Sequence, residues 1–473
     1  MYIVYILIYQ YNVFLLYFQV KIQKYTLVRF LQLCYNINQY KSNNREETIM
    51  GDYRFDTKCV QGAYRPKAGE PRVIPIVQST TFSYEDPDQM ADLFDLKAND
   101  PFYTRLGNPT SSHFENKMAL LEGGVGALAL SSGQSANFFA IINICNAGDH
   151  VISSSKIYGG TFNLFRVSLK KLGIDFTFVD PDAEIEEIMA CAKPNTKALF
   201  GETLANPILN VLDFAKFSEV AKRLDIPFIV DNTLATPYLC QPFNLGANII
   251  VHSATKYIDG HATSLGGVLI DGGNYNWDNG KFPDLTEPDE SYHGLCYMEN
   301  FGNAAYIVKA RAQLIRDYGC TPSPFNSFLF HLGLETLHLR MERHSYNALK
   351  LAEFLQCHPK VSWVRYPGLK TDPYYKTGQL YLPKGQSGIL SFGIKGGVAA
   401  GKALAKHLDL VAMVVHLGDL RTSILHPAST THRQLTEEQQ LQCGIQPEMI
   451  RVSVGIEDID DIIKDFDKAL NAV

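Results

Sequence analysis

A lysine at the end of an apolar run is the residue best placed for covalent chemistry. Lys256 follows the run 249–252, which has the length and composition of a buried strand, and stands beside two hydroxyl residues, Ser253 and Thr255. A lysine held in a partly desolvated position has a lowered pKa, which favours Schiff-base formation. Because a lone lysine is usually a solvated surface residue, this interpretation depends on what else lies near Lys256.

Two further segments place polar groups where other predicted strands end. Asp231 closes the run 228–230, and a carboxylate there could hold a protonated pyridine nitrogen or simply start a turn. Gly133 and Gln134 begin a predicted helix, where free N–H groups and the helix dipole favour an anion. Neither GxGxxG nor GxxxxGK[ST] occurs, which disfavours a Rossmann dinucleotide site and a P-loop.

The elements that position these residues alternate short apolar runs with amphipathic stretches, which predicts a mainly parallel sheet covered by helices. We expect strands at 127–130, 151–155, 176–179, 198–201, 228–230 and 249–252, with helices at 133–144, 161–172 and 214–224. A second, α+β domain is predicted from helices at 304–318, 324–356, 399–408, 436–442 and 459–470 and strands at 361–366, 389–392, 411–416, 422–425 and 449–454. The predicted divisions are an N-terminal arm at 50–110, a large domain at 111–310 and a C-terminal domain at 311–473. The loop at 271–294 is expected to lie on the surface.

Six stretches in order resemble the Cys/Met-metabolism family of pyridoxal-phosphate enzymes, the cystathionine γ-synthase and γ-lyase group. They are residues 103–110, 132–134, 158–161, 202 with 206–207, 230–233 and 252–261, and the likeness runs from about residue 57 to the C-terminus. The resemblance implies an aspartate-aminotransferase-like α/β fold of type I. In that fold a large pyridoxal-phosphate domain with a mainly parallel sheet precedes a smaller α+β domain.

The resemblance also implies roles for the residues around the cofactor, pyridoxal 5′-phosphate. Lys256 would carry it as a Schiff base and later move protons, and Asp231 would keep the pyridine nitrogen protonated. Tyr158 would stack on the ring, and Asn206 would touch its hydroxyl. The implied phosphate ligands are the N–H groups of Gly133 and Gln134 with the side chains of Ser253 and Thr255.

Substrate binding and assembly are likewise implied by the resemblance. Arg451 would clamp the substrate α-carboxylate, with Thr422 and Tyr103 as further substrate contacts. Tyr103 and Arg105 would reach the phosphate of a neighbouring subunit, so the protein is expected to be a homo-oligomer, a tetramer built from dimers that share active sites. His416 departs from the family pattern, in which Ser or Asn is commoner.

Three stretches, 260–267, 277–283 and 426–432, are most similar to the sulfhydrylase branch of the family. They predict γ-replacement on O-acetylhomoserine with sulfide or a small thiol, giving homocysteine or methionine in methionine and cysteine metabolism. The alternatives are a cystathionine or methionine γ-lyase and a cystathionine γ-synthase. Arg421 stands where cystathionine enzymes tend to carry Glu, and Gly160 stands where methionine γ-lyases usually carry Cys.

Composition excludes several other classes. The 473 residues are 46% hydrophobic and 19% charged, with a net charge of −6, which excludes disorder and disfavours nucleic acid as a partner. The nine cysteines form no CxxC pair, as in a protein of a reducing compartment, and a cytoplasmic location is expected. The histidines His416, His426 and His432 match no metal-ligand spacing, so no metal is predicted.

Residues 1–49 differ from the remaining chain. They contain eight Tyr but no Gly, Ala, Pro or Asp, and their residue types have A/T-rich codons. One hypothesis is that translation starts at Met50, preceded by a purine-rich stretch coding for Arg45-Glu46-Glu47, and that residues 1–49 are not native protein. The apolar run 1–20 could instead span a bilayer, whereas a secretory signal fits poorly. The first hypothesis predicts no membrane association.

Overall fold

The computed structural model describes residues 53–473 except 432, 434–435, 437 and 439–443. The chain divides into two units, Met1–Lys58 and Cys59–Val473, and the sheets and the site described below belong to the second. The hypothesis about residues 1–49, His432 and most of the helix predicted at 436–442 lie outside the described residues. Among the residues described, no helix is long and apolar enough to cross a membrane.

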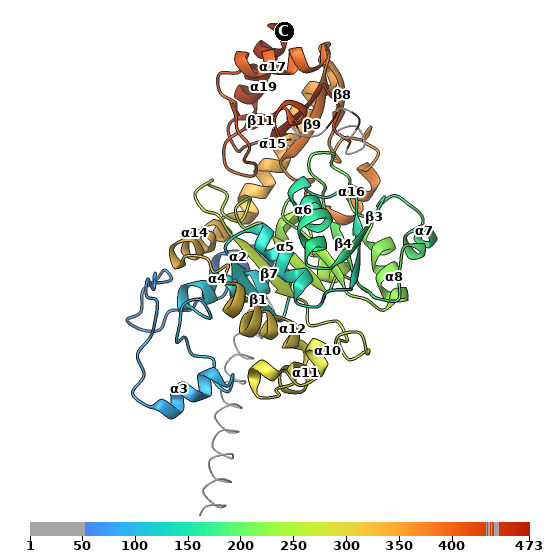
Figure 1. Ribbon diagram of the computed structural model, residues 1–473. Coiled ribbons are helices and arrows are strands. Elements are labelled where there is room, and N and C mark those ends of the chain that lie inside the picture. The colour runs from blue at the N-terminus through green and yellow to red at the C-terminus, as the bar shows by residue number, and fades with distance from the viewer. Residues whose placement is uncertain (1–52, 432, 434–435, 437, 439–443) are drawn as a thin grey trace, which may run out of the picture. The chain divides into compact units, whose positions relative to one another are not determined.

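The larger sheet has seven strands in the order β1-β7-β6-β5-β4-β2-β3 (Figure 1). The strands are β1 (Gly126–Leu130), β2 (His150–Ser154), β3 (Asp175–Val179), β4 (Thr196–Glu202), β5 (Phe228–Asp231), β6 (Ile249–His252) and β7 (Gly267–Asp271). Strands β6, β5, β4, β2 and β3 are parallel, whereas β7 is antiparallel to both β6 and β1. Strand β1 therefore points the same way as β6, and the prediction of a mainly parallel sheet is confirmed.

Helices accompany this sheet, and the predicted helix at 214–224 has the observed bounds. The helical elements are α2 (Phe55–Gln61), α3 (Pro87–Phe94), α4 (Pro109–Glu122), α5 (Gly133–Ile142), α6 (Gly159–Asn163), η1 (Leu164–Leu169), α7 (Ile185–Ala190), α8 (Phe214–Leu224), α9 (Thr236–Leu239), η2 (Pro242–Leu245), α10 (Pro283–Thr286), η3 (Glu290–Tyr292), α11 (Tyr297–Phe301), η4 (Gly302–Ala304), α12 (Ala305–Lys309), η5 (Ala310–Ile315), α13 (Arg316–Tyr318) and α14 (Pro324–Glu335). Buried Leu128, Phe139 and Ile229 belong to one apolar core that joins strands and helices. This core fixes the strand ends on which the site depends.

The smaller sheet has five strands in the order β10-β11-β12-β9-β8 and belongs to the orange and red part of the chain in Figure 1. Its elements are α15 (Leu337–Cys357), β8 (Val361–Arg365), α16 (Tyr375–Tyr381), β9 (Ile389–Ile394), α17 (Gly397–His407), β10 (Ala412–Met413), β11 (Ser423–Leu425), η6 (Pro427–Ser429), β12 (Met449–Ser453) and α19 (Ile459–Asn471). A second apolar core, which includes Leu355, Phe392 and Phe466, packs the long helices against these strands. The predicted α+β character is confirmed, and the boundaries 50–110, 111–310 and 311–473 stay predictions.

Two sequence expectations are corrected. The strand predicted at 411–416 is limited to Ala412–Met413, because the carbonyls of Val415 and His416 accept hydrogen bonds from Arg451. The loop at 271–294 is more than a surface excursion, since Trp277 is 1% exposed and stacks on Tyr306 with ring centroids 5.1 Å apart. That loop therefore contributes to the core.

Candidate active site

Three of the chemically important side chains come from neighbouring parallel strands. Glu202 ends β4, Asp231 ends β5, and Lys256 follows β6. In the register of the sheet, Glu202 and Asp231 are direct partners. Because the carboxyl ends of adjacent parallel strands meet at one edge, these residues gather in a single crevice.

The start of α5 lies at the same edge, since β1 points the same way as β6. Ser132 caps this helix, its hydroxyl accepting from the N–H of Ser135 at 3.1 Å. A Cβ added at Gly133 would lie 2.6 Å from the Cβ of Ser253, so only glycine lets the two segments approach this closely. The first N–H groups of a helix have no intrahelical partner, so this contact forms a cradle that could hold an anion such as a phosphate.

The two predicted phosphate hydroxyls differ in their surroundings. The N–H of Ser253 donates to the hydroxyl of Thr233 at 2.8 Å, and within the described part of the chain the Ser253 hydroxyl itself makes no hydrogen bond. The hydroxyl of Thr255 donates to the carbonyl of Gly266 at 3.2 Å and accepts from its N–H at 3.0 Å. The structure thus leaves Ser253 available to an anion, while Thr255 is engaged with Gly266.

Asp231 is held in place by hydrogen bonds to one of its oxygens. Its Oδ1 accepts from the N–H of Thr233 at 3.0 Å and from the Thr233 hydroxyl at 2.5 Å. Within the residues that the structure describes, its Oδ2 accepts a single, long bond of 3.4 Å from Nδ2 of Asn137 on α5. The side-chain oxygens of Asn137 and Asn206 are buried and have no hydrogen-bond partner among the described residues. Buried polar atoms are normally paired, so this crevice suits a polar ring with N–H and O–H groups.

Tyr158 is oriented through Glu202, a residue whose role the sequence did not indicate. The Tyr158 N–H donates to Oε2 of Glu202 at 2.7 Å. Burial, and secondly the charge of Asp231, raise the pKa of Glu202 well above its ordinary value. A Cβ at Gly160 would lie 2.4 Å from Cε1 of Tyr158, so the glycine makes room for the ring, which is 49% exposed. A clue available in the sequence was that Glu202 closes one apolar run as Asp231 closes the next.

Lys256 and Arg451 come from different parts of the fold, yet the charge of the arginine acts on the lysine. Burial, followed by the charge of Arg451, lowers the pKa of Lys256 to about 8. Arg451 lies on β12, is 5% exposed, and has its own pKa lowered to about 10 by burial. Its Nη2 donates to the carbonyls of Val415 and His416 at 3.1 and 3.2 Å, while its Nε is buried without a partner among the described residues. An amine with a lowered pKa therefore lies near a guanidinium with spare donor capacity.

Three predicted residues contact groups other than Lys256 and Asp231 in this chain, and their roles stay predictions. Thr422 is 1% exposed, and its N–H and hydroxyl donate to the two carboxylate oxygens of Glu457 at 2.6 and 2.9 Å. Tyr103 is 41% exposed, and the guanidinium of Arg105 lies 5.1 Å from its ring centroid. Among the described residues, no hydrogen bond or ion pair joins Tyr103 or Arg105 to Lys256 or Asp231.

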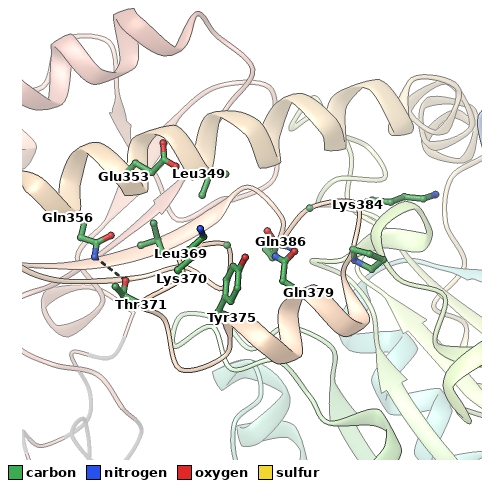
Figure 2. Close-up of a pocket in the computed structure, with 13 residues that line it drawn as sticks. Leu349, Glu353, Gln356, Leu369, Lys370, Thr371, Tyr375, Gln379, Lys384 and Gln386 are labelled. Carbon is green, nitrogen blue, oxygen red and sulfur yellow. Dashed lines mark hydrogen bonds between the residues drawn. The ribbon is translucent and has the colours of Figure 1, made fainter.

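Two other kinds of site, a metal centre and a separate cavity, carry no recognisable chemistry in the described residues. No group of three or more His, Cys, Asp or Glu that could hold a metal occurs among the described residues. A cavity of about 660 Å³ opens in the C-terminal half, where Gln356 Nε2 donates to the Thr371 hydroxyl at 3.0 Å (Figure 2). The side chains that line it, Glu353 and Lys370 among them, leave no buried polar atom without a partner. We assign no chemistry to this cavity.

Comparison with known proteins identifies the family. The family described as Cys/Met metabolism PLP-dependent enzyme matches residues 56–471. An O-acetyl-L-homoserine sulfhydrylase of Leptospira meyeri is 46% identical over 437 residues, covering 90% of this chain and 99% of that protein. A homocysteine synthase of Schizosaccharomyces pombe is 44% identical over 420 residues, covering 88% and 98%.

Solved structures agree with this assignment. A putative O-acetylhomoserine (thiol)-lyase from Campylobacter jejuni, solved with a pyridoxyl-lysine monophosphate, is similar with a TM-score of 0.85 and 38% identity, covering 89% of this chain and 100% of that one. MetB from Corynebacterium glutamicum has a TM-score of 0.76 and 32% identity, covering 89% and 99%. The chain therefore has fold type I and belongs to the Cys/Met-metabolism family of pyridoxal-phosphate-dependent enzymes.

Proposed function

We propose that this protein catalyses γ-replacement on O-acetylhomoserine, in which sulfide or a small thiol displaces acetate to give homocysteine or methionine. The observation that carries the proposal is that this chain is 46% identical to an O-acetyl-L-homoserine sulfhydrylase over 437 residues, with a buried Arg451 whose charge acts on Lys256. An amino-acid substrate needs both a base at its α-carbon and an anchor for its carboxylate, and these two side chains supply them.

The residues of the crevice fit pyridoxal phosphate, which draws electrons from the α-carbon of an amino acid when bound. Lys256 would hold its aldehyde carbon, and Asp231 would pair with its ring nitrogen. Tyr158 would stack on the ring, and the unpartnered oxygen of Asn206 would accept from the ring hydroxyl. The phosphate would lie on the cradle formed by Gly133, Gln134 and Ser253, with Thr255 supporting that segment through Gly266.

The proposed reaction assigns each proton to a group of this chain. Arg451 would hold the α-carboxylate, and the Lys256 amine would move the α-proton and then a β-proton, one at a time, so that it is neutral before each transfer. Acetate leaves from Cγ as the Cγ–O bond breaks, and the sulfur forms a bond to the same carbon. Lys256 returns protons to Cβ and Cα before the product leaves. Thr422 has no direct contact in this scheme, because its hydroxyl is held by Glu457.

We further propose a cytoplasmic homotetramer built from dimers that share active sites. The exposure of Tyr103 and Arg105, apart from the other cofactor residues, supports a role across a subunit boundary.

The choice of sulfur donor is supported by Arg421. Its side chain is exposed, and its positive charge suits an anionic sulfide better than the amino group of cysteine.

The deciding experiment is a product assay with O-acetylhomoserine and sulfide. We expect homocysteine and acetate in equal amounts, with little keto acid or ammonia. Release of a keto acid from cystathionine or methionine at a higher rate would instead identify a γ-lyase. Efficient use of cysteine as the sulfur donor would identify a cystathionine γ-synthase.

A further inference from the structure

Arg340 on α15 is a buried arginine that the proposed reaction does not use. It is 4% exposed, and all three nitrogens of its guanidinium donate hydrogen bonds. Nη1 donates to the carbonyl of Tyr257 at 2.7 Å, Nη2 to the carbonyl of Gly333 at 2.6 Å, and Nε to the hydroxyl of Thr336 at 3.2 Å. Tyr257 is the residue directly after Lys256, so this side chain joins the lysine-bearing segment to the end of α14 and the start of α15.

Two glycines let the segment after Lys256 lie against Arg340 and α14. A Cβ added at Gly260, whose φ is +68°, would lie 2.2 Å from Nη1 of Arg340. A Cβ added at Gly333 would lie 2.1 Å from the carbonyl oxygen of Ile258. Neither position has room for a side chain unless the segment moves. The Gly260 N–H donates to the carbonyl of Lys256 at 2.8 Å, so the guanidinium packs on a turn that begins at the lysine itself.

The next turn of α15 makes a second contact with Tyr257. The ring centroid of His344 lies 5.1 Å from that of Tyr257, edge to face. Burial lowers the pKa of His344 to about 4, so the ring is neutral, and its Nδ1 donates to the carbonyl of Val454 at 2.7 Å. Val454 directly follows β12, three residues after Arg451. One face of α15 therefore contacts both the segment of Lys256 and the end of the strand that carries Arg451.

We infer that Arg340 is a positioning residue for Lys256, because its bond to the Tyr257 carbonyl holds the lysine amine where it moves protons at the substrate α-carbon. The role of the amine in proton transfer rests on the proposed function, whereas the hold on its segment rests on the contacts of Arg340. A displaced amine slows the proton transfer but leaves the substrate carboxylate to Arg451. Loss of Arg340 should therefore lower kcat and leave KM nearly unchanged.

The first measurement follows exchange of the α-proton of L-norvaline with deuterium from heavy water, by NMR, on the holoenzyme. L-norvaline carries a methyl group where O-acetylhomoserine carries its leaving oxygen, so the exchange depends on proton transfer at Cα and not on which γ-reaction follows. We expect Arg340→Met to lower the kcat of exchange about 100-fold, as a displacement of about 1 Å does, with KM within about threefold of wild type.

Two further variants separate the hold on Tyr257 from other effects of the substitution. Arg343→Met, the same change at an exposed arginine of α15, should exchange as wild type. Arg340→Lys keeps the positive charge and a donor for the Tyr257 carbonyl but cannot make all three bonds, so it should regain part of the lost kcat.

Hydrogen exchange of backbone amides gives a second measurement that needs no turnover. The N–H groups of Lys256, Asp259 and Gly260 are hydrogen-bonded within the segment that Arg340 holds. In Arg340→Met we expect these amides to exchange at least about tenfold faster than in wild type, because the buried Tyr257 carbonyl has lost its donor. The amides of β5 should keep the wild-type rate.

A wild-type kcat in Arg340→Met, or a loss confined to KM, would overturn the inference. Equally faster amide exchange in β5 would overturn it too, since Arg340 would then stabilise the fold as a whole. If Arg340→Met does not fold, Arg340→Lys decides: a lowered kcat with unchanged KM supports the inference, and a wild-type kcat contradicts it. Absence of α-proton exchange in the wild-type protein would instead count against the proposed role of Lys256, and the amide measurement would still decide whether Arg340 holds its segment.

Discussion

Lys256 is the residue on which the proposed chemistry depends most directly. Its amine is half-buried and has a pKa of about 8, so a substantial fraction is neutral and nucleophilic near neutral pH. Lys256→Ala should lose the visible absorbance of a Schiff-base cofactor and at least about 1,000-fold in turnover. Absorption spectra and the product assay check this, with Lys406→Ala, an exposed lysine of α17, as the control. A variant that stayed coloured and active would mean that another amine carries the cofactor.

Glu202 gives a prediction about stability at the residue scale. Its folded-state pKa lies above 4.5, so the native chain keeps a proton that the unfolded chain has released. The stability that this difference contributes is present at low pH and is lost as the pH rises through the folded pKa. Glu202→Gln keeps an acceptor for the Tyr158 N–H but cannot ionise, so its Tm should exceed that of wild type increasingly as the pH rises.

We expect the Tm difference between Glu202→Gln and wild type to grow by about 2 °C or more between about pH 5 and about pH 8 in thermal melts of the holoenzyme. Glu219→Gln, at an exposed position of α8, should show no such trend. A constant difference across this range would show that Glu202 does not hold its proton in the folded protein.

The sequence predicted which residues end the strands but not how their hydroxyls are used. Lys256 and Asp231 could be placed because strand periodicity and burial are local signals. Thr255 and Thr422 could not, since their partners, Gly266 and Glu457, are 11 and 35 positions away and the choice of partner is a tertiary effect. The buried carboxylate of Glu202 likewise gains its role only when β4 lies beside β5.

At the scale of elements, the cradle between α5 and the segment after β6 depends on one glycine. Gly133→Ala would place a Cβ 2.6 Å from the Cβ and 2.9 Å from the Cα of Ser253, so the helix start must move. Because the N–H groups of that turn are the proposed phosphate ligands, we expect cofactor affinity to fall at least about tenfold.

Titration of the cofactor-free protein with pyridoxal phosphate measures this loss. Gln134→Ala is the matched comparison, since it removes a side chain but keeps the N–H at the same helix turn. It should weaken cofactor binding far less than Gly133→Ala. The reverse order would assign the phosphate contact to the Gln134 side chain.

The sequence located most of the strands but missed the antiparallel strand β7 of the larger sheet and many of the shorter helices. Strand β7, Gly267–Asp271, is a five-residue apolar run that follows directly on the lysine-bearing motif, so no helical stretch separates it from β6. Its reversed direction is what brings β1, and with it α5, to the edge where Asp231 lies. Strand direction depends on pairing between distant segments, which a single sequence does not display.

At the scale of the whole molecule, the proposed dimer would complete each site with Tyr103 and Arg105, both exposed, of the neighbouring chain. If they serve a neighbouring subunit, the Lys256 and the Arg105 of one chain belong to different sites, and defects in the two residues meet in one site only when they lie on different chains. In a two-fold dimer of Lys256→Ala and Arg105→Ala chains, one site then carries both defects and the other carries neither.

Refolding or co-expression of the two inactive variants should therefore restore activity. Random pairing makes half of the dimers mixed, each with one intact site, so we expect about a quarter of the wild-type activity. Each variant alone should stay inactive, and size-exclusion chromatography should show the same oligomer in all samples. A mixture no more active than its parents would mean that Arg105 serves its own chain's site. Recovery would instead establish that the active site is a property of the assembly, because no single chain in the mixture carries both groups.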